Sequence, residues 1–255
     1  MPLAAPDTRL RIGSLLYEGL DQIDLTGPYE ILSRLPNTTC RTYGTTLEPV
    51  RDVNGLRLAA DELIEDAPQL DVLQVPGGFG QEALMEDERV LSWLRSQAAG
   101  ATAVLSVCTG ALLCGAAGLL RGRRATTHWA AHHLLPFFGA TPVDERVVVD
   151  GTLYSSSGVT AGIDGALLLA AELRGAKAAQ RIQLAVEYAP EPPFDAGTPR
   201  TAPADVLAEV RAVVAARTVQ RELTARRVAA RLGVTAAPAG DGPRDAREDP
   251  RDARA

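Results

Sequence analysis

The chain has 255 residues, of which 46% are hydrophobic and 23% are charged, an ordinary balance for a globular protein that buries a sizeable core. Its formal net charge of −6 lacks the basic excess that a nucleic-acid-binding surface needs, so we expect no nucleic-acid partner. The three cysteines form no CxxC motif, which argues against a zinc site and a disulfide framework. The first residues lack the pattern of a secretory signal, and no apolar stretch is long enough to span a bilayer. We therefore expect a cytoplasmic location and no membrane partner.

Strand-like and helical patterns alternate along most of the chain. We expect strands at residues 10–17, 41–46, 71–75 and 101–107, a hairpin of 146–150 and 153–156 around Asp150-Gly151, and helices at 26–35, 87–99, 109–120, 161–173 and 176–188. Thr26 is the expected N-cap of the first helix, with Pro28 in its first turn. This βαβα order predicts an α/β fold in which a mostly parallel sheet is covered by helices on both faces.

The carboxyl-terminal part has a different composition. Residues 190–203 are rich in proline and predict a linker or surface loop, and residues 204–232 predict one more helix. From Gly233 onward the chain has almost nothing to bury, which predicts disorder. We therefore divide the chain into an α/β domain at 8–190, an extension and helix packed on it at 191–232, and a disordered tail at 233–255.

Cys108 carries the strongest local signal. It follows a continuous apolar run at 101–107 and comes directly before a helical pattern, with Gly110 just after the turn. Ligands of open parallel sheets collect beyond the carboxyl ends of strands, where Cys108 falls. A helix start favours the thiolate, so the pattern predicts a reactive nucleophile with a lowered pKa. The alternative is a buried structural cysteine, which is how we interpret Cys40 and Cys114.

Three further positions follow predicted strands or begin helices. Gly77 and Gly78 end the strand at 71–75, where two glycines allow backbone N–H groups to approach a ligand closely; a plain tight turn is the alternative. Asp24 is either a helix-capping residue or a partly buried acid that moves protons. His128 is either a base at the same sheet edge or a capping or core histidine, and His132 and His133 are expected on a helix face.

These motifs together resemble the ThiJ/PfpI superfamily, and within it the isonitrile (isocyanide) hydratases. The residues that carry the resemblance are Gln22-Ile-Asp24-Leu-Thr-Gly-Pro, Val75-Pro-Gly-Gly, Ser106-Val-Cys108-Thr-Gly, Ala125-Thr-Thr-His-Trp and Gly158-Val-Thr-Ala-Gly-Ile-Asp. The match runs from about residue 10 to residue 232. The resemblance implies a flavodoxin-like three-layer α/β sandwich, a homodimer, and Cys108 as the nucleophile on an elbow.

The resemblance also implies a reaction and a set of roles. Many superfamily members carry Glu at the position of Asp24, whereas the isonitrile hydratases carry Asp; Thr109 stands where several relatives have a His after the cysteine. The implied reaction converts an isonitrile to an N-substituted formamide, with no metal and no other cofactor. Cys108, Asp24 and Thr109 are the implied catalytic residues. The implied substrate-binding residues are Gly77, Gly78, Thr160, Ile163 and His128.

Three other functions compete with this interpretation. The superfamily also hosts glyoxalase- or deglycase-like enzymes that act on reactive carbonyls, and His128 keeps that alternative open. A redox or stress sensor would use oxidation of Cys108 without turnover. Residues 223–235 resemble the opening of a helix-turn-helix, but the Pro/Gly-rich tail offers no recognition helix, so DNA binding is disfavoured.

Overall fold

One seven-stranded sheet forms the centre of the computed structural model, which describes residues 3–5 and 7–235. The strands pair in the order β10-β11-β7-β6-β1-β2-β5. Every neighbouring pair is parallel except the β10–β11 hairpin. The strands are β1 Leu10–Leu16, β2 Thr38–Gly44, β5 Glu62–Leu63, β6 Val72–Val75, β7 Ala103–Val107, β10 Val147–Asp150 and β11 Leu153–Ser156. Two small two-stranded sheets flank it, β3 (Val50–Arg51) with β4 (Arg57–Leu58), and β8 (Arg124–Ala125) with β9 (Thr141–Pro142).

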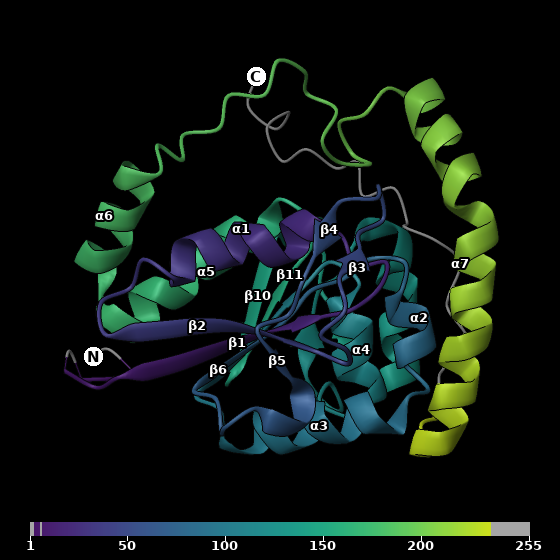
Figure 1. Ribbon diagram of the computed structural model, residues 1–255. Coiled ribbons are helices and arrows are strands. Elements are labelled where there is room, and N and C mark those ends of the chain that lie inside the picture. The colour runs from purple at the N-terminus through teal and green to yellow at the C-terminus, as the bar shows by residue number, and fades with distance from the viewer. Residues whose placement is uncertain (1–2, 6, 236–255) are drawn as a thin grey trace.

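Helices cover both faces of this sheet, which confirms the predicted three-layer α/β fold. Figure 1 shows α1 and α5 on one face and α3 and α4 on the other. The α-helices are α1 Gln22–Leu32, α2 Gln81–Leu84, α3 Glu88–Gly100, α4 Gly110–Ala116, α5 Ala161–Arg174, α6 Ala176–Ala185 and α7 Ala204–Leu232. The 3-10 helices are η1 Ile64–Asp66 and η2 Trp129–Phe138.

Alternating side chains of the central strands pack into two apolar layers, one on each face of the sheet. In β6, Val72 packs with residues of α1 and α5, whereas Leu73 and Val75 pack with residues of α3 and α4. In β7, Leu105 packs in the same layer as Val72, and Val104 packs in the same layer as Leu73. Successive side chains of a strand point to opposite faces, and a parallel sheet that is covered on both sides is apolar on both. The continuous apolar runs seen in the sequence follow from this arrangement.

Helix α1 begins earlier than its sequence predicts. Asp21, not Thr26, is the N-cap, and its side chain accepts a hydrogen bond from the N–H of Ile23. Thr26 lies inside the helix and donates its hydroxyl to Gln22 Oε1 at 2.9 Å. Asp21, Asp24 and Thr26 are all residues of capping type, and the first of them, whose N–H donates to the Gly77 carbonyl, begins the helix. As a result Asp24 sits in the first turn of the helix instead of in a loop before it.

Pro28 therefore lies within α1, where a proline removes a backbone donor. The carbonyl of Asp24, four residues earlier, is the group that this donor would have bonded. Gln74 of β6 takes its place, since its Nε2 donates to the carbonyl of Asp24 at 2.9 Å and to that of Leu25 at 3.0 Å. The hydroxyl of Ser14 in turn donates to Gln74 Oε1. This buried chain of hydrogen bonds holds the first turn of α1 against the sheet.

Other predicted elements are present with shifted ends. Strand β2 begins at Thr38 rather than at residue 41, because its pairing with β1 starts opposite Leu10. Helix α4 ends at Ala116 rather than at residue 120, since Gly118 has a φ of 85°, which an α-helix does not accommodate. The β10–β11 hairpin is confirmed, with Gly151 at a φ of 62° in its turn.

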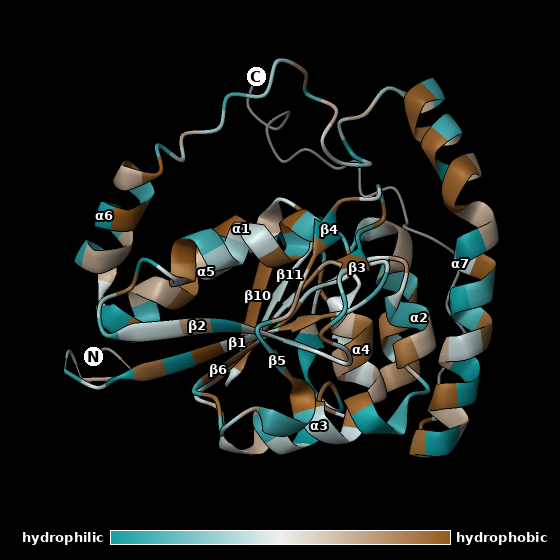
Figure 2. Ribbon diagram, viewed as in Figure 1, coloured by the Kyte–Doolittle hydropathy of each residue, from teal (hydrophilic) through white to brown (hydrophobic). Residues whose placement is uncertain are grey.

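The carboxyl-terminal helix α7 matches its predicted bounds and ends at Gly233, which has a φ of 64°. Its final turns pack against η2 and α4, whereas Figure 1 shows its first turns extending past the sheet. These first turns carry exposed valines, including Val206 and Val213, and Figure 2 shows them as a run of hydrophobic colour. The helix is continuous through residues 223–232, so no helix-turn-helix forms within the described part of the chain.

The disordered tail was predicted to begin at Gly233, but Gly233 caps α7 and Val234 packs against the core with its N–H donating to the Ala229 carbonyl at 2.9 Å. The rest of the predicted tail, from residue 236 onward, lies outside the described residues. Among those that are described, no helix combines the length and the apolar character needed to cross a bilayer.

Candidate active site

The turns after β6 and β7 meet because the two strands are parallel neighbours. Gly77 and Gly78 follow β6, and Cys108 follows β7. The segment after β1 joins them, since the N–H of Asp21 donates to the carbonyl of Gly77 at 2.9 Å. The two motifs predicted to share the carboxyl edge of the sheet, Gly77-Gly78 and Cys108, are therefore side by side, as the rule for open parallel sheets requires.

Cys108 occupies a strained backbone conformation between β7 and α4. Its φ of 54° is in the left-handed region, which costs a residue with a Cβ about 1–2 kcal/mol. Two hydrogen bonds hold its peptide groups: its N–H donates to the carbonyl of Ser156 at 3.0 Å, and the hydroxyl of Thr127 donates to its carbonyl at 2.7 Å. This conformation turns the chain sharply and places the thiol on a cavity.

Asp24 is completely buried beside this thiol. Its Oδ2 accepts a hydrogen bond from the N–H of Gly77 at 2.9 Å. Its Oδ1 is buried and has no partner of good hydrogen-bond geometry among the described residues, although interaction with the Cys108 thiol lowers the carboxyl pKa. Burial and the charge of Asp21 outweigh that interaction and the Gly77 contact, and together they raise the pKa of Asp24 well above its ordinary value.

The pKa of Cys108 is raised, not lowered as the sequence predicted. Burial of the thiol is the largest cause and the negative charge of Asp24 is the second. The N–H of Thr109 and the charge of Arg221 act in the opposite direction. The helix that follows has only seven residues, and its start does not overcome the loss of water around sulfur. Burial disfavours both anions, and the charge of Asp24 further disfavours the thiolate, so loss of a proton from this pair is opposed.

Thr109 and the two glycines organise this pair. The Thr109 hydroxyl accepts a hydrogen bond from the N–H of Gly78 at 3.1 Å and lies 3.2 Å from the Gly78 carbonyl, to which it also donates. The Gly78 N–H is therefore already engaged and is not a free donor for a bound intermediate. Gly77 does not line the cavity. Its N–H donates to the Asp24 carboxylate, so Gly77 positions the acid without facing the substrate space.

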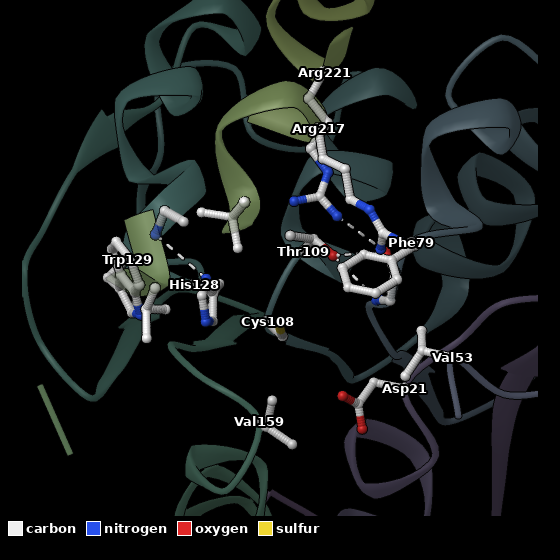
Figure 3. Close-up of a pocket in the computed structure, with 14 residues that line it drawn as sticks. Asp21, Val53, Phe79, Cys108, Thr109, His128, Trp129, Val159, Arg217 and Arg221 are labelled. Carbon is white, nitrogen blue, oxygen red and sulfur yellow. Dashed lines mark hydrogen bonds between the residues drawn. The ribbon is translucent and has the colours of Figure 1, made fainter. Parts of the chain in front are cut away.

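The cavity above Cys108 has a volume of about 220 Å³. Figure 3 shows the sulfur at its base, with His128 and Trp129 to one side and Phe79 and Thr109 to the other. Apolar groups dominate the wall, which is completed by Val53, Val159, Val210 and Val214. Its charged lining residues are Asp21, Arg217 and Arg221. A small, mainly apolar molecule fits such a space.

His128 has the capping role that was one of its alternatives, and it also faces the cavity. It is the N-cap of η2, where its Nδ1 accepts a hydrogen bond from the N–H of Ala130 at 3.3 Å, and it also lines the cavity. Burial and the positive charge of Arg221 lower its pKa to about 4, so the ring is neutral at neutral pH. His132 and His133 lie in η2, as predicted for a helix face.

The structure places Val159, and neither Thr160 nor Ile163, on the cavity. Thr160 is the N-cap of α5, and its hydroxyl accepts a hydrogen bond from Arg146 at 3.3 Å. Ile163 packs beside Gly27 of α1, where a Cβ on the glycine would lie 3.0 Å from it. The first turn of α5 directs these two side chains toward neighbouring surfaces, so direct substrate contact by them is not supported.

Several cavity residues were missed by reasoning from the sequence. Arg217 and Arg221 come from α7, far along the chain, and Tyr17 is buried beneath the site with its hydroxyl donating to the carbonyl of Pro76 at 2.9 Å. The spacing of Val210, Val214, Arg217 and Arg221 marks one face of a helix, which was the available signal. Nothing in that spacing says which surface the face would cover.

The remaining cysteines lie away from the cavity. Cys40 is in β2 and Cys114 is buried in α4, and burial raises the pKa of each thiol to about 12, in keeping with a structural role. Within the described residues, no group of three or more His, Cys, Asp or Glu side chains is arranged to hold a metal ion.

A cysteine with an acid at its side, on the carboxyl edge of a mostly parallel sheet, defines the class of site. Residues 11–172 match the model of the DJ-1/PfpI family, and the chain belongs to that family. It is 52% identical to isonitrile hydratase of Pseudomonas putida over 88% of this chain and 99% of that protein. The crystal structure of a ThiJ/PfpI family protein from Pseudomonas syringae superposes with a TM-score of 0.83 at 38% identity, and the match covers 86% of this chain and 91% of that one.

Proposed function

We propose that this protein is an isonitrile hydratase, which converts an isonitrile to an N-substituted formamide. The similarity to the Pseudomonas putida enzyme over nearly the whole of both chains supports the activity. The observation that carries the mechanism is the buried pair of Asp24 and Cys108 at the base of a small, mainly apolar cavity. An isonitrile has an electrophilic terminal carbon and no leaving group, so a soft sulfur nucleophile with an acid beside it suits the reaction.

The first step adds the thiol across the terminal carbon. The Cys108 S–H bond breaks as the S–C bond forms, and Asp24 receives the proton from sulfur and delivers it to the same carbon. The product is a neutral thioimidate, Cys108-S–CH=N–R. Because the pair exchanges its proton internally, the raised pKa of the thiol is compatible with attack, and no free thiolate has to form in the resting protein.

The second step adds water to the C=N carbon and expels the thiol. Asp24 takes a proton from the water and passes it to the nitrogen while the remaining OH bonds to carbon, so that a tetrahedral carbon bearing S, OH and NH–R results. Collapse to the formamide breaks the C–S bond and returns the proton to sulfur. The N–H of Thr109, which acts on the sulfur in the free protein, supports the sulfur as negative charge grows on it.

Turnover of cyclohexyl isocyanide by the purified protein tests this function, with formamide measured by chromatography. Loss of product formation is expected for Cys108→Ala, and a decrease of about 100-fold or more for Asp24→Asn, the usual range for removal of a general acid–base. Cys40→Ala is the matched control, because Cys40 lies outside the cavity, and it should retain activity. Methylglyoxal assayed in parallel separates the carbonyl-directed alternative. Turnover of methylglyoxal without turnover of any isonitrile would refute the proposal.

The proposal includes assembly into a homodimer in the cytoplasm. Large apolar side chains are exposed on the segments after α5, among them Leu184, Phe194 and Val213, which are 79–83% exposed. Exposed apolar groups of this kind favour a protein contact. Light scattering coupled to size-exclusion chromatography would give the mass of the assembly, and a monomer at micromolar concentration would refute this part. Cell fractionation tests the location.

A further inference from the structure

One wall of the cavity carries two positive charges that the hydration mechanism leaves unused. Val210, Val214, Arg217 and Arg221 form a single stripe along α7, and all four line the cavity above Cys108. The two arginines are one helical turn apart, a rise of about 6 Å. In Figure 3 both side chains descend from α7 toward Phe79 and Thr109. They therefore face the same small space from adjacent turns.

Arg221 is a buried cation that forms no ion pair with a carboxylate of the described residues, although the Cys108 thiol and Glu82 act on it electrostatically. It is 7% exposed, and its Nε is buried with no hydrogen-bond partner among the described residues. Its Nη2 donates only to the Gly78 carbonyl, at 3.4 Å, and none of the described ion pairs includes it. Buried charges are costly unless they are paired. Glu82 acts on it electrostatically, but that carboxylate already accepts a hydrogen bond from Thr224 at 3.1 Å.

Arg217 lies over the aromatic ring of Phe79 on the wall of the same cavity. Its guanidinium carbon is 3.5 Å from the centroid of the Phe79 ring, and no carboxylate of the described residues forms an ion pair with it. A contact with the ring attracts the cation without using its N–H donors, and no hydrogen bond of the described residues involves the Arg217 guanidinium. The two arginines are close enough for the charge of Arg217 to lower the pKa of Arg221. The charge of Arg221 in turn lowers the pKa of His128.

The acidic groups of the cavity lie on its other side. Asp21 lines the wall near Val53, and its carboxylate accepts a hydrogen bond from the start of α1. Asp24 is beneath Cys108 and retains its interaction with the thiol. Figure 3 shows Cys108 between Asp21 on one side and the two arginines on the other, and both guanidinium groups are free of ion pairs among the described residues. The charge of Arg221 also acts on the Cys108 sulfur.

From this arrangement we infer that the substrate is an isonitrile that carries a carboxylate. The carboxylate binds the N–H edges of Arg217 and Arg221, and the isocyano carbon reaches the sulfur of Cys108. A carboxylate accepts paired hydrogen bonds from guanidinium groups in a planar geometry that a neutral alkyl isonitrile does not offer. The cavity volume of about 220 Å³ favours a short chain between the two groups. This inference rests on the proposed function and specifies its substrate class.

Turnover of matched acid and ester substrates tests it. Isocyanoacetate and 4-isocyanobutanoate are compared with their methyl esters, and kcat/KM is measured for each by formamide production. The wild-type protein should prefer each acid, and the preference should fall as salt is added. Arg217→Gln and Arg221→Gln should each reduce the acid-to-ester ratio by about tenfold or more, the loss expected when a charge-assisted hydrogen bond is removed. The Lys variants at both positions should recover part of the ratio.

Arg211→Gln is the matched control, because Arg211 is exposed on the same helix, does not line the cavity, and its loss changes the net charge equally. It should leave the ratio unchanged. Equal turnover of acid and ester by the wild-type protein would overturn the inference. An equal fall in kcat/KM for the acid and the ester in the Gln variants would also overturn it, because it would mean that the arginines act on the Cys108 sulfur and not on a substrate carboxylate.

A binding measurement keeps this result separate from the proposed function. Calorimetry with the Cys108→Ala variant compares N-formylglycine with its methyl ester and needs no turnover. Tighter binding of the acid, weakened by Arg217→Gln, supports the carboxylate site even if no isonitrile is hydrated. Failure of turnover would then count against the proposed function alone, whereas equal binding of acid and ester would overturn the inference.

Discussion

Gly77 is the position where one added methyl group should do the most damage to the site. A Cβ at this residue would lie 2.6 Å from the Thr109 nitrogen, 2.7 Å from its hydroxyl and 2.8 Å from Asp24 Oδ2. Real Cβ contacts are essentially never that short. The nitrogen is a backbone atom, and the two side-chain oxygens are buried and held by hydrogen bonds from Gly78 and Gly77. Gly77→Ala must therefore push apart the nucleophile turn, the acid or both.

The cost of this substitution has a structural and a catalytic part. Overpacking of a filled interior costs about 1–3 kcal/mol of unfolding free energy. The hydrogen bond from the Gly77 N–H to Asp24, 2.9 Å long, is stretched as well. A displacement of a catalytic group by about 1 Å reduces the rate by about 100-fold. We therefore expect a moderate fall in stability together with a much larger fall in kcat/KM.

Urea unfolding and isonitrile turnover measure the two parts separately. Gly158→Ala is the control, since a Cβ there meets only His128 Cδ2, at an ordinary 3.7 Å, and it should leave the unfolding midpoint nearly unchanged. A Gly77→Ala protein that keeps more than half of the wild-type kcat/KM would refute the reasoning, because it would show that Asp24 and Thr109 need not be where the structure places them.

Three further outcomes are expected. First, burial raises the pKa of Asp24 above its ordinary 3.8, so the folded state binds this proton more tightly than the unfolded state, and the contribution of Asp24 to stability falls as pH rises above about 4. Asp24→Asn should flatten this dependence in urea titrations between pH 5 and 8; an unchanged slope would assign it to other groups. Second, the charge of Asp24 raises the pKa of Cys108, so Asp24→Asn should speed alkylation of Cys108 by iodoacetamide at neutral pH, as followed by mass spectrometry. Slower alkylation would contradict the assigned sign. Third, Gln74→Met keeps the side-chain length but loses both hydrogen bonds to the carbonyls of α1, and should cost about 1–3 kcal/mol in urea unfolding for each buried acceptor left unsatisfied. A midpoint equal to that of the wild type would show that water replaces the amide.

Local sequence determined the parts of this fold that depend on short-range pattern. The apolar run before Cys108 predicts a strand that is buried on both faces, and β7 is such a strand. Asp87 predicts the start of α3 because its side chain accepts hydrogen bonds from the first free N–H groups of the helix. The edge where Cys108 and Gly77 meet was also predictable, since the carboxyl ends of neighbouring parallel strands coincide.

Tertiary structure decided the start of α1 and the electrostatics of the site. A proline within a helix is unfavourable locally, so the sequence placed Pro28 in a first turn; Gln74, from a strand much later in the chain, compensates for the missing donor. The pKa of Cys108 depends on competition between burial and nearby donors, and burial wins. No local pattern reports the amount of water that a fold removes.

The two arginines of α7 illustrate the same division. Their helical spacing is visible in the sequence, and α7 has the bounds that the sequence predicts. Their approach to Cys108 depends on how the final turns of α7 pack on η2 and α4, after an irregular segment that fixes no direction. Periodicity specifies which residues share a helix face, whereas only long-range packing specifies what that face meets.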